Sequence, residues 1–110
     1  MKVSEFIEKY SLEIITDSDY PDRDIKGCYI GDLLSWVMGK AQSGNVWITI
    51  MNNINIVAVA SLTDTACILL CEGVSADDAI IAKANEEGII ILKSDKTAFE
   101  LATMIAGDVV

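Results

Sequence analysis

The sequence predicts an α/β fold: a single domain with a mostly parallel sheet and flanking helices. Three apolar runs, at residues 46–51, 66–71 and 89–92, are short and continuous, which is typical of strands buried on both faces. Helical patterns alternate with these runs through the second half of the chain, and that order indicates a parallel sheet with right-handed crossovers. A length of 110 residues fits one domain, residues 1–110.

The first part of the chain predicts a helix, a strand, a loop and a second strand. Residues 4–10 have a helical pattern with one apolar face, and Ser4 is a plausible N-cap. The β-branched run at 12–16 and the run at 25–30 predict strands. The polar stretch 17–24 contains the only proline and predicts the loop between them.

Two helices are expected on either side of the first buried strand, 46–51. Asp32 stands where it can cap a helix over residues 33–41, which carries a broad apolar surface. The stretch 54–62 is ambiguous, since its β-branched residues favour a strand and its alanines favour a helix. Parallel neighbours need a connection of a dozen or more residues, so we interpret 54–62 as a crossover helix.

The last two predicted helices follow the remaining buried strands. Ser75 is the expected N-cap of a helix over residues 76–87. Ser94 or Asp95 is the expected N-cap of a final helix from Lys96 to about 105.

The charge balance argues against several classes of partner. The net charge is −9, with eight basic residues outnumbered by seventeen acids, whereas phosphate backbones are bound by clustered Lys and Arg. We therefore expect no nucleic-acid partner. No stretch approaches the roughly 18 apolar residues of a membrane span, and no signal peptide is evident, so we expect no membrane partner and a cytoplasmic location.

Catalytic and metal chemistry have little support in the composition. The chain has three cysteines and no histidine, which excludes a Ser-His triad and leaves a zinc site short of ligands. Neither a P-loop nor a dinucleotide-binding glycine motif is present. We expect no catalytic residue, no metal and no cofactor, and hence no enzyme activity.

Ligands of open α/β sheets bind beyond the carboxyl ends of the strands. The loops predicted there are residues 31–32, 51–53, 72–75 and 93–95. The first candidate ligand-binding residues at this edge are Gly31, Asp32, Asn52, Asn53, Asn55 and Gly73. The asparagines have two interpretations, because they can bind a polar ligand or simply turn the chain and start a helix.

Asp22 and Arg23, in the acidic loop, complete the candidate set. They can serve a ligand, or they can form a local ion pair in a solvated loop. Trp36 and Trp47 are expected to serve the core or an interface.

Several ordered motifs together resemble the DRTGG domain family over nearly the whole chain. They are DRDIKGCYIGDLLS at 22–35, GNVWITI at 44–50, NIVAVA at 55–60, ACILLCEGV at 66–74 and GIIIL at 88–92. The resemblance implies a fold similar to the N-terminal domain of HPr kinase/phosphorylase and to the middle domain of long phosphotransacetylases. It also implies an accessory, regulatory role, because the kinase activity belongs to a separate P-loop domain.

Two functional hypotheses follow. The first is a non-catalytic regulatory module that acts through protein contact and self-association, with a homodimer expected. The second is a sensor of an adenine nucleotide or another small polar metabolite.

Overall fold

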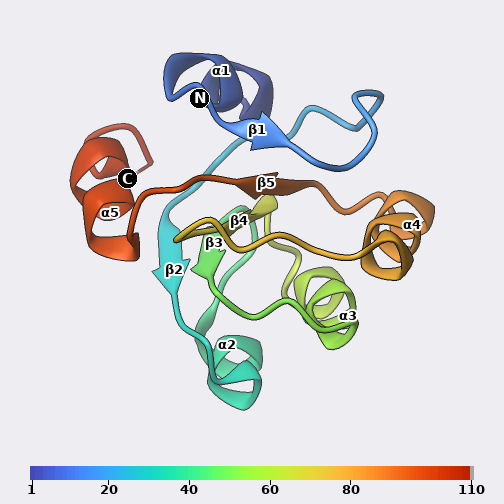
Figure 1. The fold of residues 1–110 in the computed structure, drawn as a ribbon. Coiled ribbons are helices and arrows are strands. Elements are labelled where there is room, and N and C mark those ends of the chain that lie inside the picture. Colours follow the sequence, from blue (N-terminus) through green and yellow to red (C-terminus); the bar gives the residue numbers. More distant parts are fainter. Residues whose placement is uncertain (110) are drawn as a thin grey trace.

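The computed structural model describes residues 1–109, which form a five-stranded sheet with helices on both faces (Figure 1). The elements are α1 (Val3–Lys9), β1 (Glu13–Ile14), β2 (Cys28–Ile30), α2 (Leu34–Lys40), β3 (Val46–Thr49), α3 (Asn55–Thr63), β4 (Cys67–Leu70), α4 (Asp78–Glu87), β5 (Ile91–Lys93) and α5 (Ala98–Ile105). The strand order is β1-β5-β4-β3-β2. Strands β2 to β5 are parallel, and β1 alone runs antiparallel, beside β5. The predicted fold class, mostly parallel α/β, is confirmed.

Consecutive strands from β2 to β5 are neighbours in the sheet, so each crossover helix lies on the same side. Helices α2, α3 and α4 cover one face and α1 and α5 cover the other (Figure 1). The spatial order of the parallel strands therefore follows their order in the chain from β2 to β5. The sheet lacks the switch point, where strand order changes direction, at which doubly wound sheets open a crevice for ligands.

Burial on both faces explains the continuous apolar runs of the sequence. Successive strand side chains point to opposite faces. Val46 and Ile48 accordingly join the core under α1 and α5, whereas Trp47 joins the core under α2, α3 and α4. All four residues of β3 and of β4 are buried.

The ambiguous stretch is helical, because α3 spans Asn55–Thr63 as the connection between parallel β3 and β4. The strand predicted over residues 25–30 is shorter than expected, since only Cys28–Ile30 pairs with β3. The helix over 33–41 forms as α2, but Val37 is its only buried residue. Its broad apolar surface mostly faces outward.

The predicted helix N-caps are wrong in each case. Ser4 lies inside α1, and its backbone N–H and hydroxyl donate to the carboxylate of Asp22. Leu33 occupies the N-cap position of α2, because the carboxylate of Asp32 turns toward β3 instead.

The caps of the last two helices lie two or more residues later than predicted. Asp77, and not Ser75, accepts a hydrogen bond from the backbone N–H of Ile80 at the start of α4. Thr97, and not Ser94 or Asp95, caps α5 in a reciprocal box with Glu100.

Within residues 1–109, none of the helices has the length and apolar character that crossing a bilayer requires.

Candidate functional site

The structure divides the candidate residues between opposite edges of the sheet. Gly31, Asp32 and the three asparagines lie in loops or a helix start that directly follow a parallel strand, as does Gly73, and so they share the carboxyl edge. Arg23 instead contacts Asp64 and Thr65, which precede β4 at the amino edge.

At the amino edge, Arg23 holds the end of helix α3. Its Nη1 donates to the carbonyl oxygen of Thr65 at 2.9 Å, and its Nη2 donates to that of Asp64 at 3.2 Å. Nη1 also lies 3.0 Å from Oδ1 of Asp64. Asp64 is the left-handed C-cap of α3, so the guanidinium satisfies carbonyl groups that a helix end leaves free. The Ser43 hydroxyl and Arg23 hold the pKa of the Asp64 carboxyl below its usual range.

Asp22 acts at the start of α1. Its Oδ1 accepts from the backbone N–H of Ser4 at 2.9 Å, and its Oδ2 accepts from the Ser4 hydroxyl at 2.5 Å. These bonds lower the pKa of the Asp22 carboxyl. A hollow of about 320 Å³ lies beside Asp22 and Arg23, but both side chains are already engaged by the chain itself.

At the carboxyl edge, the polar candidates connect neighbouring loops. Oδ1 of Asp32 accepts from the Thr49 hydroxyl at 2.8 Å and from the backbone N–H of Ile50 at 3.0 Å. Asp32 thereby joins the loop after β2 to the end of β3.

Two of the three asparagines bond to their own chain, in different ways. Oδ1 of Asn53 accepts from the backbone N–H of Asn55 at 2.9 Å, which is a local turn at the start of α3. Nδ2 of Asn52 donates to the carbonyl oxygen of Ser75 at 3.0 Å and so joins the loops after β3 and β4.

Gly73 joins the loops after β4 and β5. Its φ of +75° is in the left-handed region that favours glycine, and its N–H donates to the carbonyl oxygen of Ser94 at 3.0 Å. A side chain at this position would also lie 3.3 Å from Oδ1 of Asp95. The loop thus leads directly to a hollow at the end of β5.

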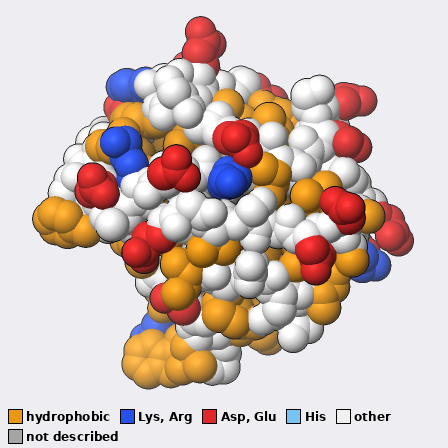
Figure 2. All heavy atoms as spheres, viewed as in Figure 1, with side chains coloured by type: hydrophobic (Ala, Val, Ile, Leu, Met, Phe, Trp, Pro, Cys, Tyr) orange, Lys and Arg blue, Asp and Glu red, His pale blue; other side chains and the backbone are white. Residues whose placement is uncertain are grey.

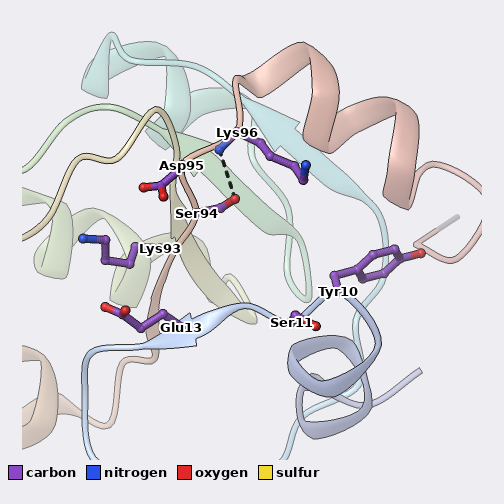
Figure 3. A pocket seen from close by; sticks show the side chains of 7 residues that line it. All are labelled: Tyr10, Ser11, Glu13, Lys93, Ser94, Asp95 and Lys96. Atoms are coloured by element: carbon purple, nitrogen blue, oxygen red, sulfur yellow. Dashed lines mark hydrogen bonds between the residues drawn. The ribbon is translucent and has the colours of Figure 1, made fainter.

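That hollow, about 410 Å³ in volume, was missed by sequence reasoning (Figure 3). Its lining residues are Tyr10, Ser11, Glu13, Lys93, Ser94, Asp95 and Lys96. Glu13 and Lys93 face one another across the β1–β5 pair and point the same way in Figure 3. We call it the polar hollow. The order of strands and helices predicts the loop 93–95 at this edge, but the hollow forms only where antiparallel β1 brings the α1–β1 turn to the carboxyl end of β5.

A second unpredicted feature lies at the other end of the sheet. An uncharged groove of about 240 Å³ runs between β2 and α5. Its lining residues among those described are Gly27, Cys28, Ile30, Ala102, Ile105, Ala106 and Val109. Ile30, which lines this groove, is 46 % exposed, and Leu33 and Trp36, which follow β2 along the chain at the start of α2 on the other face, are 61 % and 58 % exposed. We call the groove and these three side chains the apolar edge.

Two of the three cysteine thiols are held in their protonated form by burial. Burial raises the pKa of Cys28 to about 11 and that of Cys67 to about 12. A thiol is nucleophilic only as the thiolate, so neither reacts readily near neutral pH. In residues 1–109, no three carboxylate or thiol groups gather into a metal-binding cluster.

Comparisons with known proteins agree with the sequence motifs. The model of the DRTGG domain family matches residues 7–107. A solved structure that contains the CBS and DRTGG domains of the regulatory region of Clostridium perfringens pyrophosphatase, complexed with its activator diadenosine tetraphosphate, has a similar fold. The TM-score is 0.71 at 13 % identity, over 94 % of this chain and 45 % of that one, so this chain spans less than half of that region. None of the curated proteins matches.

Proposed function

The chain belongs to the DRTGG domain family, and from that premise we propose that residues 1–110 form one non-catalytic regulatory module that binds protein surfaces, including a second copy of itself. The observation that carries this proposal is the apolar edge. Trp36 and Leu33 are more than half exposed in a chain whose core already buries Trp47 completely. Apolar side chains that gather on a surface typically mark an interaction site.

The apolar edge extends over helix α2. In Figure 2 hydrophobic side chains protrude where α2 lies in Figure 1. The Nζ of Lys40 lies 5.1 Å from the centre of the Trp36 ring, so the only charged group of α2 is a cation stacked on the aromatic surface. Such an arrangement suits a contact with another protein.

The state of the carboxylates supports a non-catalytic role. Asp22, Asp32 and Asp64 each accept hydrogen bonds from their own chain. Two carboxylates that serve as general acid and base need a shared cleft and opposed pKa values. These three hold helix ends and loops together instead.

Sedimentation velocity at increasing protein concentration tests the proposal. We expect reversible association in the micromolar range, lost in the double variant Leu33→Ser/Trp36→Ala. The matched control is Leu62→Ser, because Leu62 is 72 % exposed on α3, away from the apolar edge. A wild-type protein that stays monomeric and a partner screen that does not depend on Trp36 would refute the proposal.

The alternative function is a metabolite sensor, and two observations favour it. The polar hollow lies at the carboxyl edge, where α/β sheets bind ligands, and it has Lys93 and Lys96 on its walls. The Clostridium perfringens region of similar fold is complexed with a nucleotide activator. Gly31, Asp32 and the three asparagines stay candidate ligand-binding residues. They would contact a ligand in addition to the hydrogen bonds that this region makes within the chain.

A thermal-shift screen with nucleotides, with and without Mg²⁺, tests the alternative. A ligand at 100 times its Kd stabilises a fold by about 2.7 kcal/mol, which a domain of this size reports clearly. The shift should disappear in Lys93→Ala/Lys96→Ala and persist in Lys40→Ala. No shift with any nucleotide would exclude this function. The cytoplasmic location and the lack of nucleic-acid and membrane partners stay predictions from composition.

A further inference from the structure

We propose that the polar hollow binds a small zwitterion of the α-amino acid class, a molecule that carries an ammonium group and a carboxylate close together. Lys96 and the Ser94 hydroxyl bind the carboxylate, and Glu13 and Asp95 bind the ammonium group. This ligand differs from the nucleotide of the alternative function, and its binding does not depend on self-association.

The charged side chains of the polar hollow are balanced but unpaired. Two lysines, Lys93 and Lys96, and two acids, Glu13 and Asp95, line it. Within residues 1–109 none of these four forms an ion pair, although Glu13 and Lys93 are directly opposite one another in the β1–β5 ladder. A ligand can therefore use these charges without first breaking an ion pair. Four of the other six basic residues do pair with an acid, and they are Lys2, Lys9, Arg23 and Lys83.

The charges of the hollow are separated into two sides. In Figure 3 Glu13, Lys93 and Asp95 lie on one side of Ser94, and Lys96 lies on the other. Two acids and one lysine give the lining of the first side a net charge of −1, whereas that of the second side carries +1. A zwitterion has the complementary separation of charge, so one orientation of it is attracted to both sides.

The Ser94 hydroxyl adds a donor between the two sides. Its Oγ accepts from the backbone N–H of Lys96 at 3.2 Å. A serine hydroxyl that accepts keeps its own O–H for donation. A carboxylate only accepts hydrogen bonds, and it accepts them most strongly from charged donors. The Ser94 O–H together with the Lys96 ammonium therefore favours a carboxylate on this side.

Hydrogen bonds to the loop after β4 hold the backbone of residues 94–96 in place. The N–H of Ser94 donates to the carbonyl oxygen of Leu70 at 2.9 Å. The N–H of Gly73 donates to the carbonyl oxygen of Ser94 at 3.0 Å, and that of Glu72 donates to the carbonyl oxygen of Lys96 at 2.8 Å. A pre-organised backbone loses less conformational entropy on binding, which matters for a ligand that makes few contacts.

Size and charge favour a small neutral molecule over a polyphosphate. The volume of about 410 Å³ is near the lower end of the range of small-molecule sites, about 300–1,000 Å³. A polyphosphate would bring several negative charges next to Glu13 and Asp95, in a chain whose net charge is already −9. An amino acid with an uncharged side chain adds no net charge.

A thermal-shift screen of the protein L-amino acids, each at millimolar concentration, tests the ligand class. We expect at least one of them to stabilise the chain. Calorimetric titration then compares that amino acid with its amide, which lacks the carboxylate, and with its N-acetyl form, which lacks the ammonium group. Each derivative should bind roughly tenfold weaker, because it loses one charged contact. No stabilisation by any amino acid, or equal binding of a derivative, would overturn the proposal.

Variants of the lining residues test the site. Lys96→Gln and Asp95→Asn should each weaken binding of the amino acid roughly tenfold, with unchanged far-UV circular dichroism. The matched control is Lys26→Gln, the same substitution in the hollow at the amino edge, and it should leave binding unchanged. Equal weakening by Lys26→Gln and Lys96→Gln would show that the polar hollow is not the site.

The outcomes separate this ligand class from the functions proposed above. A nucleotide that stabilises the chain through Lys93 and Lys96, while no amino acid does, would overturn the zwitterion and favour the nucleotide sensor. Self-association through the apolar edge is measured by sedimentation without ligand, so failure of the amino-acid screen leaves that function intact.

Discussion

The two edge strands of the sheet, β1 and β2, differ in length, direction and surroundings. The β1 edge is two residues long, runs antiparallel and borders the charged polar hollow. The β2 edge is three residues long, belongs to the parallel part and borders a groove whose described lining is uncharged. β1 carries the exposed charge of Glu13 on the strand itself, whereas the three residues of β2 are uncharged, and charged side chains on an edge strand discourage another strand from pairing.

This difference shows how the two edge strands of one sheet can differ in their protection against pairing with another strand. Glu13 is exposed on β1 opposite Lys93, so a second strand added there would bury charge. At the β2 edge Ile30 is 46 % exposed, so an added strand there would remove apolar surface from water. The side chains of the two edge strands thus differ in what burial would cost.

The largest expected effect separates the two tryptophans near β2. Trp47 is fully buried and donates its Nε1–H to the carbonyl oxygen of Gly31 at 2.9 Å. Trp47→Ala should lower the free energy of unfolding by about 3–5 kcal/mol. Trp36→Ala should change it by less than about 0.5 kcal/mol, because the side chain is exposed. Urea unfolding at low protein concentration measures both. Similar losses would mean that Trp36 serves the fold.

Introducing a lysine at one edge strand or the other tests the comparison directly. Ile30→Lys should weaken self-association at least tenfold, which corresponds to about 1.4 kcal/mol. Glu13→Lys at the β1 edge should leave it unchanged. Sedimentation equilibrium gives both constants. Equal weakening by the two variants would show that the β2 edge has no special part in association.

Asp22 should affect stability and not association. Asp22→Ala removes the two hydrogen bonds to Ser4 at the start of α1, and we expect a loss of about 1 kcal/mol, as for a helix cap. Asp22→Asn keeps an acceptor and should lose less. Denaturant unfolding gives the loss, and a dimerisation constant that moved with Asp22 would contradict this assignment.

The smallest expected effect is a pH dependence near the groove. Hydrogen bonds from Lys9 and Tyr10 lower the pKa of the Asp108 carboxyl. Because the folded pKa is depressed, this contribution is present above the unfolded pKa near 3.8 and is lost as pH falls through the folded value.

Acid should therefore loosen the Asp108 contact, and with it Val109, which forms one wall of the groove. Asp108→Asn should flatten the fall in unfolding midpoint as the pH drops below 3.8. Asp95→Asn serves as a matched control and should leave that fall unchanged. An unaltered acid limb in Asp108→Asn would show that the contact contributes nothing to stability.

Local sequence patterns were sufficient to predict much of the fold. Continuous apolar runs predict strands buried on both faces, and β3 and β4 are buried throughout. The length of the connection between them predicts α3, although the composition of 54–62 is ambiguous. Motif order along the chain predicts the family, which the match over residues 7–107 confirms. All of these features lie within a few neighbouring residues or in their sequence order.

The candidate site and the starts of α1 and α2 depended on contacts between distant segments. Asp22 binds Ser4, Arg23 holds the end of α3, and Asp32 turns to Thr49 instead of capping α2. The polar hollow requires β1 beside β5, and the apolar edge requires that β2 be the last strand. By itself the sequence determined which segments become strands and helices, because hydrophobic period and connection length are local properties. Only the tertiary structure decided which strand stays unpaired and which polar groups satisfy one another, because those choices depend on packing between segments far apart in the chain.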